Sequence, residues 1–157
     1  MTTFEAIALH LRQVYFEKNW TASCLKPALD VVAFEHIHLS PLGLNSIAWL
    51  AYHIGYYISI ASERLNGGSY DMLDAISFDH PPLETPEAWD AFREELYAQA
   101  ETFAQQLEVL DDSLLHTDFE APKYGSYWRN VMGIVEHTHY HLGQLVLVHK
   151  IIRESEA

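Results

Sequence analysis

Cysteine is nearly absent from this chain of 157 residues, in which Cys24 is the only one. A single thiol can form no internal disulfide and cannot supply a cluster of thiolate metal ligands. The first residues, MTTFEAIALHLRQ, also lack the basic start and the apolar run of a secretory signal peptide. These features predict a reducing, cytoplasmic setting, and no neighbouring motif would activate Cys24 as a nucleophile.

Positive charge is scarce as well. Nine Lys and Arg residues stand against twenty-two Asp and Glu residues, which gives a formal net charge of -13. A surface of this sign repels phosphate backbones and anionic lipids, so we expect neither a nucleic acid nor a membrane as a partner.

Long apolar runs are missing too. The uncharged segment 46–62 contains tyrosines and a histidine, and it is shorter than the roughly 20 residues of a membrane span, so a buried helix explains it better.

Four stretches show the periodicity of amphipathic helices, and no stretch shows a convincing alternation typical of a strand. These stretches are residues 2–20, 45–65, 85–109 and 127–153. They predict an all-α protein, a four-helix bundle formed by a single domain over residues 1–157, with long connections between helices 1 and 2, 2 and 3, and 3 and 4. Connections of this length allow a topology other than simple up-and-down.

The predicted helices begin with side chains that cap helices. Thr2 has the capping-box spacing to Glu5, Asn45 or Ser46 precedes the second helix, and Thr85 is followed by Pro86. The connection over residues 19–44 contains several Pro and Gly residues and is expected to hold little regular structure. The second and fourth helices are apolar over more than one stripe, which predicts a central position or a second buried face in a homodimer.

The last helix carries EHTHYHLGQ, with three histidines in five residues. At 100° per residue, His137 and His141 stand about 40° apart on one face, and Gln144 falls about 20° from His137. His139 stands about 160° from His137 and therefore cannot join them. The face that carries the pair also carries Ile134, Leu145 and Val148. These two imidazoles should therefore point into the bundle, where they could bind one divalent ion.

A third candidate ligand, His53, lies in the second helix on a stripe with Trp49 and Tyr56. If this helix faces the last one, His53, His137 and His141 form a three-histidine site with an open position for water or substrate. Trp49, Tyr56 and Gln144 would then surround the site. The alternative is that each histidine is a core residue hydrogen-bonded to a hydroxyl or a carbonyl, and that Gln144 is an ordinary surface glutamine.

The other histidines have less specific settings. His80, in SFDHPP, could lie on a loop over the site, although a plain turn residue is the simpler explanation. We expect surface or loop positions for His10, His36, His38, His116 and His149. The pattern is not HExxH, because Thr138 occupies the position of the glutamate that acts as the base in metallopeptidases.

Several of these motifs resemble one known family. SIAWLAYHIGYY around His53 and GIVEHTHYHLGQLV around His137 and His141 are similar to the metal-binding motifs of the DinB-like (DinB/YfiT) four-helix-bundle superfamily. The similarity extends through NWTASCLKPAL, SFDHPP and YGSYWRN to an uncharacterised branch, and so covers nearly the whole chain. It implies that the three histidines hold a divalent metal, typically zinc or nickel, and that homodimers are frequent.

The resemblance leaves the reaction open. The leading hypothesis is a thiol-dependent S-transferase, in which the metal lowers the pKa of a low-molecular-weight thiol that then attacks an electrophile. The alternatives are a metal-dependent hydrolase that uses metal-bound water, and a non-enzymatic metal-binding or stress-related bundle. Glu136 could assist hydrolysis, but it lies about 100° from His137 around the helix.

Overall fold

The computed structural model describes residues 1–68 and 76–156, and over these residues the protein is helical. Its four long helices are α1 (Thr3–Tyr15), α3 (Ile47–Leu65), α4 (Pro86–Glu108) and α5 (Tyr127–Ser155). The described residues form no strand, only an isolated antiparallel bridge between Asp118 and Ser126. The all-α prediction is confirmed. Within the same residues, no helix combines the length and the apolar character needed to cross a membrane.

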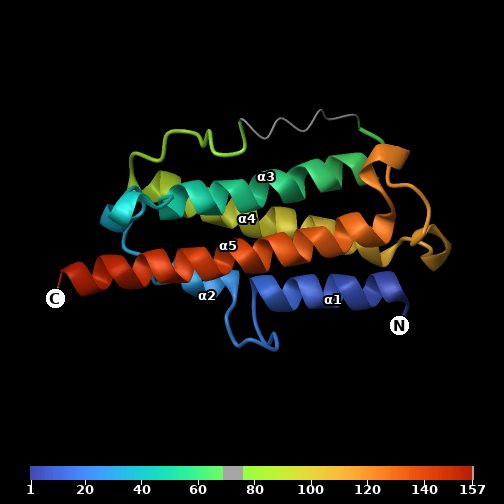
Figure 1. Ribbon diagram of the computed structural model, residues 1–157, viewed down its shortest axis with the longest axis horizontal. Coiled ribbons are helices and arrows are strands. Elements are labelled where there is room, and N and C mark those ends of the chain that lie inside the picture. The colour runs from blue at the N-terminus through green and yellow to red at the C-terminus, as the bar shows by residue number, and fades with distance from the viewer. Residues whose placement is uncertain (69–75, 157) are drawn as a thin grey trace.

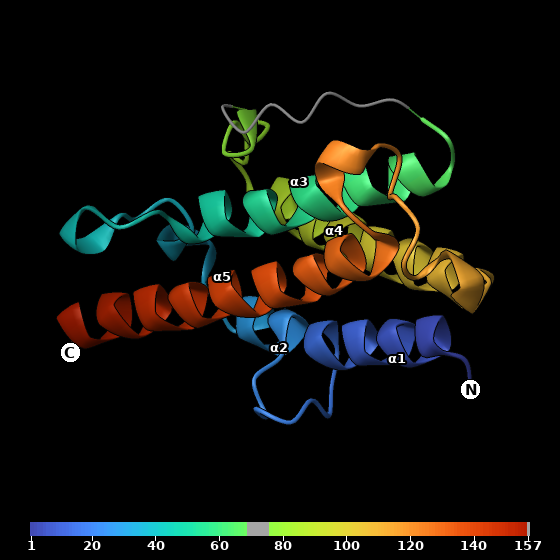
Figure 2. The ribbon, with the colours of Figure 1, turned by 45° about the vertical axis from the view of Figure 1, so that its right-hand side comes forward.

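The four helices pack as a bundle in which α1 and α3 occupy opposite corners. Helix α1 lies against α4 and α5, and α3 lies against the same two helices. Figures 1 and 2 show that α3 and α4 run in one direction, whereas α1 and α5 run in the other. The topology is therefore not simple up-and-down. Because α3 and α5 are antiparallel neighbours, their middle turns face each other, and this pairing positions the site.

A hydroxyl side chain caps the start of each long helix. Thr2, Ser46, Thr85 and Ser126 each accept a hydrogen bond from a backbone N–H in the first turn. Thr2 and Glu5 form the complete capping box, and Ser46 rather than Asn45 is the cap of α3. These caps satisfy N–H groups that have no partner inside the helix, so the sequence signals located the helix starts well.

The segment between α1 and α3 is more ordered than expected. Helix α1 ends at Tyr15, not near Trp20, and Trp20 is 97% exposed. A short helix, α2 (Leu25–Asp30), follows, with 3-10 turns at Phe34–His36 and Pro41–Gly43. Pro27 does not break α2, because it lies in the first turn, where its missing N–H would have had no helical partner.

Charged side chains join α1 to α4 at the bundle surface. The Arg12 guanidinium donates to both carboxylate oxygens of Glu101, at 2.9 and 2.8 Å, and it also pairs with Glu108. The hydrogen bond from Arg12 lowers the pKa of Glu101 below its ordinary value of 4.5. The carboxylate form is therefore favoured by folding, and the stability it contributes is present above pH 4.5 and is lost as the pH falls through the lowered pKa.

Glu101→Gln should lower the free energy of unfolding at pH 7 by less than about 1 kcal/mol, since the pair is partly exposed. This difference from the wild type should shrink as the pH falls from 7 to well below 4.5, through the lowered pKa of Glu101. Urea unfolding across this range measures it, with the exposed Glu136→Gln as the control. A difference that stays constant as the pH falls below 4.5 would contradict the assignment.

Candidate metal centre

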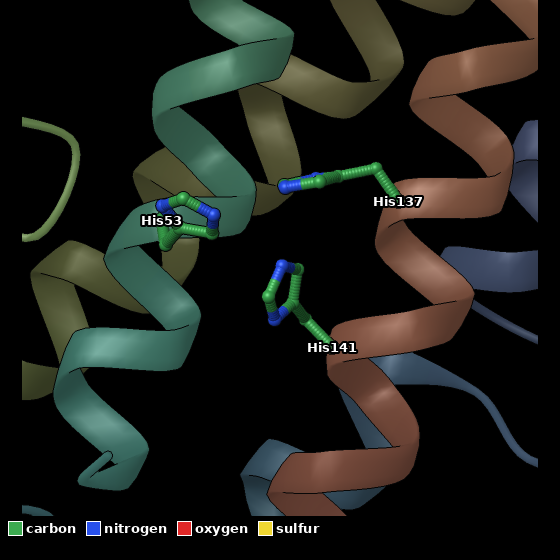
Figure 3. Close-up of side chains that lie close together, drawn as sticks. All are labelled: His53, His137 and His141. Atoms are coloured by element: carbon green, nitrogen blue, oxygen red, sulfur yellow. The ribbon is translucent and has the colours of Figure 1, made fainter. Parts of the chain in front are cut away.

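Three histidines meet between α3 and α5 at the middle of the bundle. Figure 3 shows His53 projecting from α3 toward His137 and His141, which project from adjacent turns of α5. The ring centroids are 4.8 Å apart for His53 and His137, 4.6 Å for His53 and His141, and 4.4 Å for His137 and His141. One ligand nitrogen of each ring lies within 4.8 Å of the others. His53 and His141 are buried, and His137 is half-buried.

The remaining histidine of EHTHYHLGQ faces a different helix. The ring of His139 lies 6.3 Å from that of His10 on α1. Burial, together with the neighbouring His10, lowers the pKa of His139. The helical geometry therefore separates His139 from the pair formed by His137 and His141, as the spacing predicts.

Gln144 orients His141. The Nδ1 atom of His141 lies 2.7 Å from the side-chain oxygen Oε1 of Gln144, one turn further along α5. Because an amide oxygen only accepts hydrogen bonds, Nδ1 must carry the proton, and Nε2 then carries the lone pair. Burial lowers the pKa of His141 although the hydrogen bond to Gln144 opposes this shift. The ring is thus neutral with a fixed tautomer, which is the form that binds metals.

His53 is held by a segment that lies between α3 and α4 in the sequence. Its Nδ1 atom lies 2.9 Å from the hydroxyl oxygen of Ser77, which is completely buried. The ring of Phe78 stacks on the imidazole of His53, with centroids 4.0 Å apart and planes 6° apart. Ser77 and Phe78 therefore hold the His53 side of the cluster, and His80 turns instead toward His38, on which it stacks at 5.6 Å.

Tyr57 is the aromatic residue of α3 nearest to the cluster. Its ring lies 5.0 Å from that of His53 and 4.6 Å from that of His137. Trp49 is 44% exposed, with its ring 6.3 Å from Phe78, and Tyr56 lines a groove between α3 and α4. Sequence reasoning named Trp49 and Tyr56 but missed Tyr57, whose spacing of four residues from His53 could have identified it.

One of the histidines expected at the surface is buried. His36 lies in a 3-10 turn but is only 8% exposed, because it packs near the end of α5, where its Nε2 atom lies 3.0 Å from a carboxylate oxygen of Glu156. His10 and His149 are half-buried, and His38 and His116 are exposed. Cys24 is buried, and its thiol donates to the backbone oxygen of Gln13, away from the histidine cluster.

The donor set of the cluster fits a divalent transition metal. Within the described part of the chain, the group consists of three imidazoles and includes no carboxylate or thiolate. His53 and His141 each have an uncharged hydrogen-bonding partner, Ser77 and Gln144 respectively, which orients the ring without being a metal ligand itself. Three imidazoles suit zinc and nickel, and a set of three protein ligands leaves room for an external ligand.

Comparisons with known proteins agree with this arrangement. The model of the DinB superfamily matches residues 16–145, a span that contains α3, α4 and the part of α5 that carries the histidines. Neither the curated proteins nor the solved structures that were compared with the chain gave a match.

The hydrogen bond to Gln144 generates a test of the site. Gln144→Ala should weaken zinc binding by about 10- to 100-fold, because His141 loses the partner that fixes its tautomer and ring orientation. Competition with a chromophoric chelator measures the affinity. Gln99→Ala on α4 serves as the control and should leave the affinity unchanged, and equal zinc affinities of the two variants would contradict the role of Gln144.

Proposed function

The chain belongs to the DinB superfamily, and from this we propose that it is a divalent-metal-dependent S-transferase that uses a low-molecular-weight thiol. His53, His137 and His141 hold the metal, for which zinc and nickel are the candidates. A bound divalent cation supplies Lewis acidity, which lowers the pKa of a thiol that it coordinates. In the reaction, a sulfur–carbon bond forms as the bond to the leaving group breaks, and the proton of the thiol passes to solvent.

The observation that carries this proposal is the donor set of the cluster, which consists of three imidazoles within the described part of the chain. Ser77 and Gln144 orient two of the imidazoles without adding negative charge. A thiol with a lowered pKa ionises near neutral pH without a dedicated base, so a site of this kind supports thiol chemistry. Hydrolysis is the second candidate, but it usually also relies on a general base that activates water.

The described residues offer no suitable carboxylate for that role. Glu136 is exposed, and its position on α5 is about 100° from His137 around the helix axis. It is not part of the group of potential metal ligands. This position favours transfer to a thiol over hydrolysis.

Aromatic side chains shield part of the cluster from water. Phe78 covers one face of His53, and Tyr57 lies beside both His53 and His137. Such side chains exclude water from part of the site, which strengthens electrostatic interactions there and limits competing hydrolysis. Their role in the reaction is to shape the site, and neither needs to exchange a proton.

Incubation of zinc- or nickel-loaded protein with a thiol and a model electrophile tests the proposal. With cysteine or glutathione and a chlorodinitrobenzene, we expect thiol consumption above the uncatalysed rate, measured by loss of free thiol. His137→Ala should return the rate to background, because the metal loses a ligand. Glu136→Gln should leave the rate unchanged.

Two results would contradict this function. Hydrolysis of a nitrophenyl ester without any thiol turnover would favour the hydrolase. The absence of both activities across a broad panel of thiols and electrophiles, with metal bound, would favour a non-enzymatic metal-binding protein.

A further inference from the structure

A cavity of about 280 Å³ opens between α3 and α5 on the side of the cluster that faces the start of α5. His137 forms part of its wall, so the cavity reaches the candidate metal centre directly. Four apolar side chains also line it, namely Ile60, Ala61, Phe119 and Ile134, together with Tyr57, Asn130 and Gly133. The volume lies near the lower end of the roughly 300–1,000 Å³ that is usual for small-molecule sites.

Two arginines also line this cavity, and this is unexpected in a protein with so few basic residues. Arg64 comes from the last turn of α3, and Arg129 comes from the first turn of α5. The whole chain has nine Lys and Arg residues against twenty-two Asp and Glu residues. Two of these nine cations therefore border the cavity that His137 lines.

The charge of Arg64 is balanced locally. Arg64 is buried, and its Nε atom lies 2.9 Å from a carboxylate oxygen of Glu120. Its guanidinium also lies over the ring of Tyr124, 4.3 Å from the centroid. These contacts fix Arg64 as part of the cavity wall.

Arg129 differs from Arg64 in that no carboxylate of the described residues forms an ion pair with it. It is exposed, and it occupies the first turn of α5, which contains no acidic residue. A cation is unfavourable at this position, because the helix dipole makes the N-terminal end of a helix positive. Arg129 thus adds uncompensated positive charge to an end of the helix that is already positive.

The backbone beside Arg129 makes room for its side chain. Gly125 has a φ of 78°, and a Cβ atom added there would lie 2.9 Å from Cδ of Arg129. A larger residue at 125 would therefore displace the stem of Arg129. The first N–H groups of α5 are already bonded, to Leu115, Thr117 and Ser126. The guanidinium of Arg129 is consequently a donor that this end of the cavity offers without a carboxylate partner among the described residues.

From this arrangement we infer that the cavity binds a small carboxylate with an apolar body, whose carboxylate pairs with Arg129 and whose other end points toward His137. The planar guanidinium matches a carboxylate through two parallel hydrogen bonds. The apolar walls accommodate a body about as large as one aromatic ring. The strongly negative surface elsewhere disfavours polyanions, whereas a single carboxylate suits one uncompensated arginine. The inference rests on the proposed function, because it names the substrate class of the same site.

Binding of phenylacetate, with phenylacetamide as its uncharged counterpart, tests the inference by isothermal titration calorimetry. The measurement is made on metal-free full-length protein, because a carboxylate could otherwise bind the metal directly. We expect the wild type to bind phenylacetate more tightly than phenylacetamide. Arg129→Gln should weaken phenylacetate binding by about tenfold or more, since a charged hydrogen-bonding partner is lost.

Arg153→Gln is the matched control, because Arg153 is an exposed arginine in the last turn of the same helix. It should bind phenylacetate as the wild type does, and circular dichroism should show that both variants are folded. Equal affinity for the acid and the amide, equal losses in the two variants, or no binding of phenylacetate at millimolar concentration would overturn the inference. The result is independent of metal content and thiol turnover, so failure here is distinguishable from failure of the proposed function.

Discussion

The site depends on the burial of neutral imidazoles between two antiparallel helices. A polar ring in an apolar interior is costly unless its nitrogen atoms find partners. His141 meets this requirement through Gln144 on its own helix, and His53 meets it through Ser77 from outside α3. Both partners are uncharged, so they orient the rings without compensating the charge of a cation that would bind there. The arrangement thus gives buried ring nitrogens hydrogen-bonding partners and also brings three potential nitrogen ligands close together.

The distribution of charge gives the same region a second property. The protein is strongly acidic as a whole, and ion pairs of its described residues lie on the outer surfaces of the helices, as with Arg12 and Glu101. The cavity beside His137 adds Arg129, with which no carboxylate of the described residues forms an ion pair. An anionic small molecule would therefore find a favourable place next to the histidine cluster, in a protein that is strongly negative as a whole.

Sequence reasoning predicted the helices and the histidine cluster because both depend on local spacing. Thr2, Ser46 and Thr85 mark helix starts through caps that act within one turn, and His137 and His141 share a face because they are four residues apart. The contact of His53 with His137 and His141 joins two helices that are far apart in the sequence, so spacing alone does not predict it. It is expected from the apolar surroundings of the three histidines and from the family resemblance.

The contacts that were missed come from irregular segments or from a neighbouring helical position. Ser77 and Phe78 follow no periodic pattern, so nothing in the sequence indicates that they reach back to His53. The sequence does not reveal helix α2, because Pro27 in the connection between α1 and α3 suggests irregular structure. It does not single out Tyr57 either, because the neighbouring Tyr56 also shares a stripe with His53. His36 is buried by the end of α5, a contact between residues 120 positions apart that spacing cannot reveal.

The central claim is that the three histidines bind a metal, and elemental analysis of the purified protein tests it most directly. The account predicts about one zinc or nickel per chain, lost in His53→Ala, His137→Ala and His141→Ala and retained in His139→Ala, whose side chain faces α1. A wild-type protein that stays empty after reconstitution with zinc and with nickel would contradict it, as would an equal loss of metal in His139→Ala.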